Sequence, residues 1–392
     1  MKKNKILFMD NQSGAAKFLV PLLDEFNNEY ETIFIHNDSR YLNQKNSYTK
    51  SFSKSIDIAM HSNSLHMLFN KIMPDLIVIV TIHGVFHRWV MYVADSMGIP
   101  VFFAPHGTKL KGTGASGEKK SLGHKASRAL FYISDWIYIF KDSVRMNFKG
   151  FKDILRTFFE FYFNKSRFSD NPKTSWGFKL DTIFLNYKEE EEFFRGFMNL
   201  KNSNETQFIV SGNLLGDSEI VNSKNFDSSI DNSKVLYVSQ PLVGSGFTNI
   251  DQQIDLFQKI YAVLKKNDKQ LIFRPHPRDD KSFLKYAEDN SIPISQNLDF
   301  AEDLQKYNYF IGFFSAGLFS SSRSGKPTLS LQIEGIPKFP YISENKKLLQ
   351  FAFEDIEMGV NALLNSNTDE KSVHDFKPAS LIISETIKNA IK

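Results

Sequence analysis

The stretch Gln270-Leu-Ile-Phe-Arg-Pro-His-Pro-Arg278 is a short apolar run that ends in two prolines around a histidine. A short apolar run bounded by such a break is typical of a buried strand in a parallel sheet. The prolines restrict the backbone and remove N–H donors, so they hold the imidazole of His276 at the carboxyl end of that strand. Ligands of open α/β sheets bind at this end, so the motif predicts a binding site.

The same rhythm of strand and helix extends from this stretch through the whole chain, in two halves of similar size. Alternating strands and helices predict an α/β fold of two doubly wound, Rossmann-like domains that face a central cleft. The expected strands are Lys5–Met9, Glu31–His36, Leu76–Thr81, Val101–Ala104, Val235–Ser239, Gln270–Arg274, Tyr309–Phe313 and Thr328–Leu331. The expected helices are Ala15–Phe26, Arg88–Met97, Ile250–Lys266, Asp280–Asp289 and one from Gly317 to Arg323.

The length and a polar stretch suggest where the domains divide. At about 150 residues per domain, 392 residues predict two domains. We expect an N-terminal acceptor-side domain over residues 1–205 and a C-terminal nucleotide-donor domain over 206–345. Ile209–Gly212 fits either half. Residues 346–392 read as two helices that pack back on the first domain.

The composition excludes several classes of protein. Apolar residues make up 42% of the chain, and the net charge of +4 is too small to indicate a nucleic-acid partner. The absence of cysteine excludes disulfides, thiolate metal sites and a cysteine nucleophile. No apolar stretch has the length of a secretory signal core or a membrane span, which predicts a cytoplasmic protein.

The side chains around the proline-flanked histidine suit an anion. Arg274 and Arg278 bracket His276 and Pro277, and guanidinium groups bind phosphoryl oxygens and repel metal ions. We therefore expect these four residues to contact a phosphate or nucleotide. The alternative is a half-buried histidine in a rigid turn.

A serine-rich stretch follows a later strand, in Phe313-Phe-Ser-Ala-Gly-Leu-Phe-Ser-Ser-Ser322. Amides and hydroxyls at a helix start bind anions, so Ser315, Gly317, Ser320 and Ser321 are expected to contribute to the same phosphate site. The alternative is an ordinary serine cap of a helix.

Two residues of the first half are candidates for taking the proton of an acceptor hydroxyl. His106 follows a strand in Ala104-Pro-His-Gly-Thr-Lys-Leu110, and a neutral imidazole accepts protons near neutral pH. Asp10 follows the first strand in a polar turn that lacks the dinucleotide-binding glycines. The alternatives are a turn histidine bonded to the backbone and an aspartate that caps a helix.

Two further features bear on whether the protein binds a metal ion and whether it contacts a membrane. His83 and His87 have a helical metal-pair spacing, but no glutamate follows in the zinc-protease pattern, so we expect no metal. Phe148–Phe163 is basic and aromatic, which favours peripheral contact with a membrane interface. The alternative is a helix that packs on the core or on a second copy.

The motifs together resemble those of a known class of enzymes. The paired α/β halves resemble GT-B glycosyltransferases, and Arg274-Pro-His-Pro277 with the later Ser315 and Ser320-Ser321 resembles the His-Pro and Ser-Ser motifs of bacterial sialyltransferases. Similar arrangements occur in some Kdo transferases. The resemblance covers Val235 to Leu331 and implies that these residues contact the CMP portion of a CMP-sugar. The acidic motif that supplies the base in those enzymes has no matched position here.

A second resemblance points to a different product. Pro105-His-Gly-Thr-Lys-Leu-Lys111 is similar to the Trp-His-Gly-Thr-Pro-Leu-Lys motif of CDP-glycerol polyolphosphotransferases, which implies His106 as the base. Their Thr-Asp-Tyr-Ser-Ser motif is absent, because this chain has Gly312-Phe-Phe-Ser-Ala-Gly317 there. Both families release CMP.

These observations predict an inverting, metal-independent transferase that moves a sialic-acid-like nonulosonate from a CMP-sugar to a glycan or lipid-linked glycan. Capsule or lipopolysaccharide assembly at the inner face of the cytoplasmic membrane is the expected setting. The alternatives are a CDP-glycerol-type transferase, a nucleotide-sugar 2-epimerase and a non-catalytic membrane-associated assembly protein.

Overall fold

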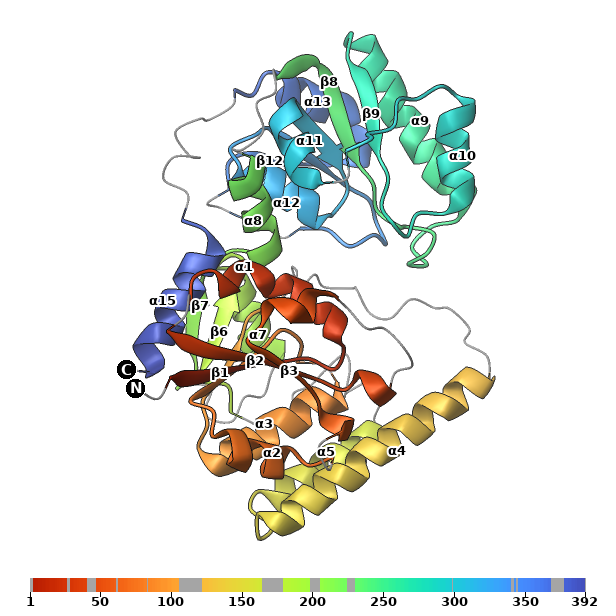
Figure 1. Ribbon diagram of the computed structural model, residues 1–392. Helices are drawn as coiled ribbons and strands as arrows, with labels where there is room; N and C mark the ends of the chain where they lie inside the picture. Colours follow the sequence, from red (N-terminus) through yellow and green to blue (C-terminus); the bar gives the residue numbers. More distant parts are fainter. Residues whose placement is uncertain are drawn as a thin grey trace. The chain divides into compact units, whose positions relative to one another are not determined.

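The computed structural model describes residues 3–26, 29–40, 47–60, 63–82, 84–105, 122–163, 179–197, 205–223, 230–297, 299–339, 342, 345–367 and 377–391. The described residues form two compact units (Figure 1). The first holds those up to Leu215 and returns at Pro378, and the second holds those from Gly216 to Lys377.

The first unit is built on a parallel sheet with the strand order β3-β2-β1-β4-β5-β6-β7. Every neighbouring pair in it runs parallel. The strands in chain order are β1 (Asn4–Met9), β2 (Tyr30–His36), β3 (Lys54–Asp57), β4 (Leu76–Ile79), β5 (Val101–Phe103), β6 (Thr182–Leu185) and β7 (Gln207–Val210).

Helices cover both faces of this sheet. Leu7 and Met9 face a cluster with α2 (Leu65–Ile72) and α3 (Val85–Met97), whereas Ile6 and Phe8 face one with α15 (Ala379–Ile391). Burial on both faces explains why the inner strands, such as β1 and β4, carry apolar runs without polar alternation. The other helices are η1 (Ser13–Phe18), α1 (Val20–Leu23), η2 (Asp38–Arg40), η3 (Ser47–Ser51), η4 (Ile58–Met60), α4 (Leu122–Arg145), α5 (Phe151–Phe163) and α7 (Glu190–Phe197).

The second unit contains a smaller parallel sheet with the order β12-β11-β10-β8-β9. The strands in chain order are β8 (Asp231–Val238), β9 (Gln270–Arg274), β10 (Tyr307–Gly312), β11 (Thr328–Gln332) and β12 (Leu348–Ala352). The helices are α8 (Leu214–Ser223), which begins in the first unit, α9 (Ile250–Lys266), α10 (Lys281–Asp289), α11 (Phe300–Lys306), α12 (Ala316–Arg323), η6 (Phe353–Asp355) and α13 (Ile356–Leu364).

Both sheets have a topological switch point. At this point the chain has built strands on one side of the first strand of the sheet and continues on its other side. In the first sheet it lies between β1 and β4, which pair from Ile6 with Leu76 to Met9 with Ile79. In the second it lies between β8 and β10. The crevice outside the carboxyl ends of such strands is where open α/β sheets bind their ligands.

Three expectations from the sequence need correction. Ala15–Phe26 is not one helix but η1 and α1, because Pro21 lacks the N–H that would continue the first helical turn. Gln207–Val210 pairs with β6, so the units divide after Leu215 and not after residue 205. Leu348–Ala352 is a strand of the second sheet and α13 packs on that sheet, so only α15 lies on the first unit.

Candidate functional site

The loop after β9 holds His276 in one orientation. The His276 N–H donates to Asp279 Oδ2 at 2.7 Å, and the Arg278 N–H donates to His276 Nδ1 at 3.0 Å. Since Nδ1 accepts, Nε2 carries the proton in the neutral ring. Burial and the charge of Arg278 lower the pKa of His276, which favours that neutral ring. The half-buried imidazole therefore presents Nε2–H as a donor.

Arg274 is already paired. Its Nη1 forms an ion pair with Asp303, whose side chain is fully buried, and donates to the Asn297 carbonyl at 3.1 Å. Asp303 also accepts from Ser295 at 2.8 Å. The guanidinium lies 5.3 Å from the ring centre of Phe300. Through these contacts Arg274 joins β9 to α11. The exposed Arg278, by contrast, forms no ion pair among the described residues.

The start of α12 lies at the end of β10, next to the switch point. Ser315 caps the helix, because its Oγ accepts from the Leu318 N–H at 3.0 Å. A Cβ at Gly312 would lie 2.7 Å from the Val238 carbonyl oxygen, and one at Gly317 would lie 3.1 Å from the ring of Phe300. The absence of both side chains lets the chain pass close to β8 and to Phe300.

The two paired serines of α12 face different ways. Ser320 Oγ donates to the Ala316 carbonyl at 3.0 Å, and the Ser320 hydroxyl also acts to lower the pKa of Glu219 on α8. Ser321 is fully buried, and its Oγ bonds to the Leu318 carbonyl and to Thr328 Oγ1, both at 2.9 Å. Ser321 therefore ties α12 to β11, and we leave it out of the proposed anion site.

Glu219 was not identified from the sequence. Burial and the charge of Asp299 raise its pKa to about 7, although Arg274 and Ser320 act in the opposite direction. Glu219 therefore titrates near neutral pH, and it lies close enough to Ser320 and Arg274 for both to affect its pKa. No local motif marks Glu219, because α8 lies far from β9 and α12 in the sequence.

In the first unit, the structure describes one of the two expected proton acceptors. Asp10 follows β1, is 7% exposed, and its Oδ2 lies 3.1 Å from Nε2 of His87 on α3. Burial raises the pKa of Asp10, but the charge that His87 carries when protonated and the hydrogen bonds from His87, Gln12 and Thr81 outweigh it, and the net shift is downward. His106 and His83 lie outside the described residues.

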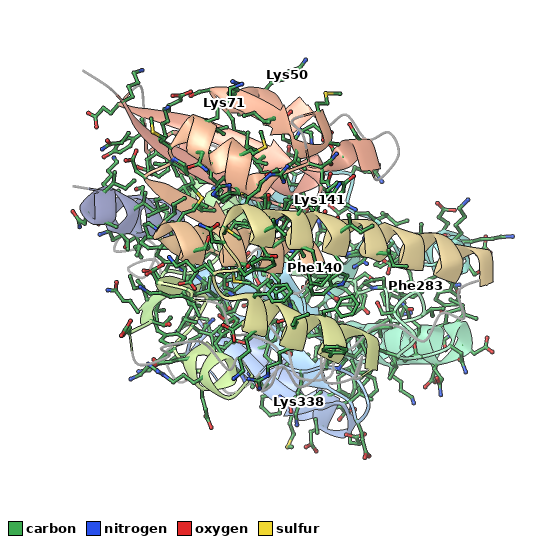
Figure 2. The ribbon with its side chains drawn as sticks, turned by 90° about the horizontal axis from the view of Figure 1, so that it is seen from below. Lys50, Lys71, Phe140, Lys141, Phe283 and Lys338 are labelled. Carbon is green, nitrogen blue, oxygen red and sulfur yellow. The ribbon has the colours of Figure 1, made fainter. Side chains whose placement is uncertain are left out.

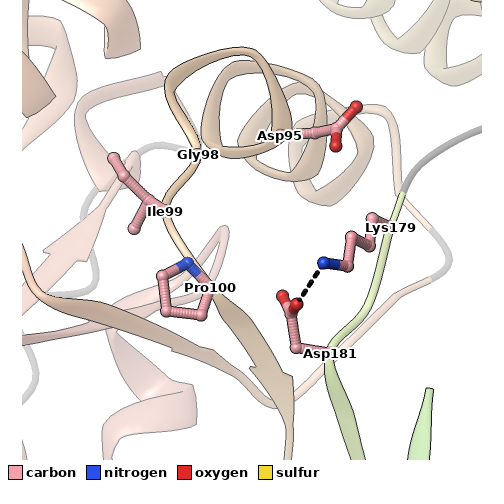
Figure 3. A pocket seen from close by; sticks show the side chains of 6 residues that line it. All are labelled: Asp95, Gly98, Ile99, Pro100, Lys179 and Asp181. Carbon is pink, nitrogen blue, oxygen red and sulfur yellow. Dashed lines mark ion pairs between the residues drawn. The ribbon is translucent and has the colours of Figure 1, made fainter. Parts of the chain in front are cut away.

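A pocket of about 100 Å³ in the first unit lies at the opposite edge of the sheet (Figure 3). Asp95, Pro100 and an ion pair between Lys179 and Asp181 line it, and Pro100 and Asp181 precede β5 and β6. It therefore opens at the amino ends of the strands, away from the switch point. Within the described ranges, no group of three or more acidic or histidine side chains is placed to hold a metal ion.

Comparison with known proteins agrees with this architecture. Residues 133–302 match the family model of alpha-2,8-polysialyltransferase, a segment that contains His276 and ends before α12. No curated protein matched in a sequence search.

Solved structures share the fold at low identity. UDP-GlcNAc 2-epimerase from Methanocaldococcus jannaschii, in complex with UDP-GlcNAc and UDP, is 14% identical with a TM-score of 0.54, covering 99% of this chain and 100% of that one. The Neisseria meningitidis UDP-GlcNAc 2-epimerase is 13% identical with a TM-score of 0.53, over 98% and 100% of the two chains. The glycosyltransferase of kitacinnamycin is 9% identical with a TM-score of 0.53, over 100% of both.

These comparisons confirm two expectations from the sequence. The fold is that of two-domain GT-B proteins, with two parallel sheets and their helices. The family match supports a glycosyltransferase of the sialyltransferase type. The chain therefore resembles the GT-B glycosyltransferases, and over residues 133–302 the polysialyltransferases among them.

Proposed function

We propose that this protein transfers a sialic-acid-like sugar from a CMP-sugar to a glycan acceptor. The observation that carries the proposal is the polysialyltransferase family match over the segment in which His276 presents a free Nε2–H at the end of β9. The enzymes of that family model act, by its name, on sialic acid. We propose no metal requirement, and a role in capsule or lipopolysaccharide assembly.

The donor CMP is proposed to bind in the second unit, at the carboxyl edge of its sheet. His276 Nε2–H, Arg278 and the amides at the start of α12 would contact the phosphate, and Ser320 would contribute a hydroxyl. These groups are donors or cations, so they stabilise the charge that develops on departing CMP. Arg274 would act indirectly, because its pairing with Asp303 fixes the strand end that carries His276.

Thermal unfolding with CMP, CDP, UDP and GDP, without added metal, tests the donor. We expect CMP to raise the melting temperature most, since a ligand that binds only the folded state stabilises it. CMP release from CMP-sialic acid with an oligosialic acid acceptor then tests transfer. Selective stabilisation by UDP or GDP would refute the CMP assignment.

The same panel tests the alternatives. UDP-GlcNAc 2-epimerases share the fold at 12–14% identity, so an epimerase would interconvert UDP-GlcNAc without any acceptor. A CDP-glycerol-type enzyme would consume CDP-glycerol. A non-catalytic assembly protein would release no nucleotide from any of these donors.

A basic and apolar surface on α4 and α5 supports peripheral contact with a membrane. Its apolar members are each about half exposed: Ile133, Ile137, Val144, Phe148 and Phe159. The first three lie on one face of α4. The cations of α4, of α5 and of the turn between them are exposed: Lys141, Arg145, Lys149, Lys152 and Arg156. The acidic Asp135 and Asp142 are buried, so the surface is positive and apolar together.

The other face of α4 packs inside the first unit. Asp142 accepts from Trp89 Nε1 at 2.8 Å and from Ser64 Oγ at 2.5 Å, and Phe140 meets Phe158 of α5. Figure 2 shows Phe140 between the two helices and Lys141 directed away from α5. No helix within the described ranges is long and apolar enough to cross a bilayer.

Sedimentation with vesicles tests this surface. We expect binding to vesicles that contain anionic lipid, weakened by salt because exposed charges are screened. Ile137→Ser with Val144→Ser should release the protein, while Met358→Ser, an equally exposed apolar residue of α13, should not. Equal binding by both variants would refute the assignment.

A further inference from the structure

Asp10 and His87 form a buried pair at the switch point of the first sheet. Asp10 follows β1, and His87 lies in the first turn of α3, which follows β4. His87 is 3% exposed, and its Nε2 lies 3.1 Å from Asp10 Oδ2. These two strand ends border the crevice where an open α/β sheet binds its ligand.

The pairing decides which nitrogen of His87 carries the proton. An ionised carboxylate only accepts hydrogen bonds, so Nε2 must donate to Asp10. In the neutral ring, Nδ1 then holds a lone pair. Nδ1 is buried and has no hydrogen-bond partner among the residues that the structure describes, although a buried polar atom without a partner is costly. A basic nitrogen oriented by a carboxylate and left unpaired is the arrangement of a general base.

Gly84 lies beside Nδ1 of His87. Its φ of −90° and ψ of 161° are accessible to any residue, so the backbone does not require glycine here. A Cβ at this position would lie 3.0 Å from His87 Nδ1, and its next neighbours would be His87 Cε1 at 3.6 Å and Phe86 N at 4.0 Å. A side chain at this position would therefore press on Nδ1, and glycine spares the lone pair that contact.

We infer that His87 is the base of the transfer reaction, that Asp10 is its positioning residue, and that the acceptor hydroxyl binds beside Gly84. The inference rests on the proposed function. The acceptor oxygen forms the bond to the anomeric carbon while its proton moves to Nδ1. The bond between that carbon and the CMP phosphate oxygen breaks, and CMP leaves with the electron pair. Proton loss from His87 to water restores the neutral ring.

Asp10→Asn is the sharpest test, because the structure dictates how the amide must lie. Asp10 Oδ1 accepts from the Gln12 N–H at 3.2 Å, so this position must remain an oxygen. The new NH₂ then occupies the place of Oδ2 and donates to His87 Nε2. The proton moves to Nδ1, and the lone pair that would accept the acceptor proton is lost.

Long-range ¹H–¹⁵N NMR reads the ring directly and needs no turnover. With the His87 signals assigned through His87→Gln, we expect an unprotonated Nδ1 in the neutral ring of the wild type and a protonated Nδ1 in the neutral ring of Asp10→Asn. A protonated Nδ1 in the neutral wild-type ring would overturn the inference. This result stands whether or not CMP-sialic acid is the donor.

Transfer assays supply the second test. We expect Asp10→Asn, His87→Gln and Gly84→Ala each to lower the transfer rate by about 10²- to 10⁴-fold, with CMP binding unchanged. Asp38→Asn is the matched control, since Asp38 lies at the end of β2 and accepts from the Ser13 N–H at 2.8 Å, as an amide oxygen also would. Normal transfer by His87→Gln would overturn the inference alone, whereas no transfer by the wild type would overturn the proposed function.

Discussion

The two units carry different chemistry at the same edge of similar sheets. Outside β1 and β4 of the first unit, a buried carboxylate is paired with an imidazole whose second nitrogen has no hydrogen-bond partner among the described residues. Outside β9 and β10 of the second unit, an imidazole N–H, an exposed guanidinium and helix amides offer donors and positive charge. The first arrangement suits the uptake of a proton, and the second suits the binding of an anion. The same fold thus separates the two tasks of a transferase.

The largest effect on stability should come from the ion pair beneath the donor site. Asp303→Ala leaves the Arg274 guanidinium without its buried partner, so we expect about 3 kcal/mol less free energy of unfolding. Urea denaturation measures the loss. Asp255→Ala is the control, because its pair with Lys259 is more than half exposed and should contribute well under 1 kcal/mol. Equal losses would show that Arg274 is not held by Asp303.

The second prediction separates the two clusters by function. His276→Ala removes the Nε2–H donor of the second unit, and we expect about 10²-fold slower transfer with the loss of CMP stabilisation. His66→Ala, on α2 of the first unit, should change neither. The comparison fails if His276→Ala still binds CMP normally, or if Asp10→Asn loses CMP binding as well.

The third prediction concerns the close approach of β10 and β8. Gly312→Ala places a Cβ 2.7 Å from the Val238 carbonyl oxygen, which is backbone and has little room to move. We expect a loss of about 1–3 kcal/mol in the free energy of unfolding, measured by thermal or urea denaturation. Gly244→Ala meets its nearest atom at 3.4 Å and should be tolerated. Similar stability in both variants would contradict this account of the switch point.

The last prediction concerns Glu219, whose effect on stability depends on pH. Its pKa is raised to about 7 in the folded protein, so between its ordinary pKa and 7 the folded state binds more protons than the unfolded state. Folding stability therefore falls as the pH rises through that range. Glu219→Gln should remove this slope and raise the melting temperature at pH 8 but not at pH 4. CMP affinity should also fall less with pH in the variant, because one negative charge near Ser320 is gone.

The site residues that can be predicted from the sequence lie at strand ends and bear local signals. His276 stands between two prolines, Ser315 caps a helix, and Asp10 ends an apolar run, so each could be predicted from its neighbours alone. His87, Glu219 and Asp303 bear no such signal. His87 was set aside as part of an improbable metal pair, although its partner is Asp10, 77 residues earlier.

The sequence by itself determined the alternation of strands and helices, because apolar runs and proline or glycine breaks act over a few residues. It also determined which polar residues follow strands. Tertiary structure decided which strand ends meet, since strand order is set by packing across the sheet. It turned Arg274 toward Asp303, buried Ser321 against Thr328 and joined Asp10 to His87. Those contacts are long-range, and they set the charge and proton position of each group.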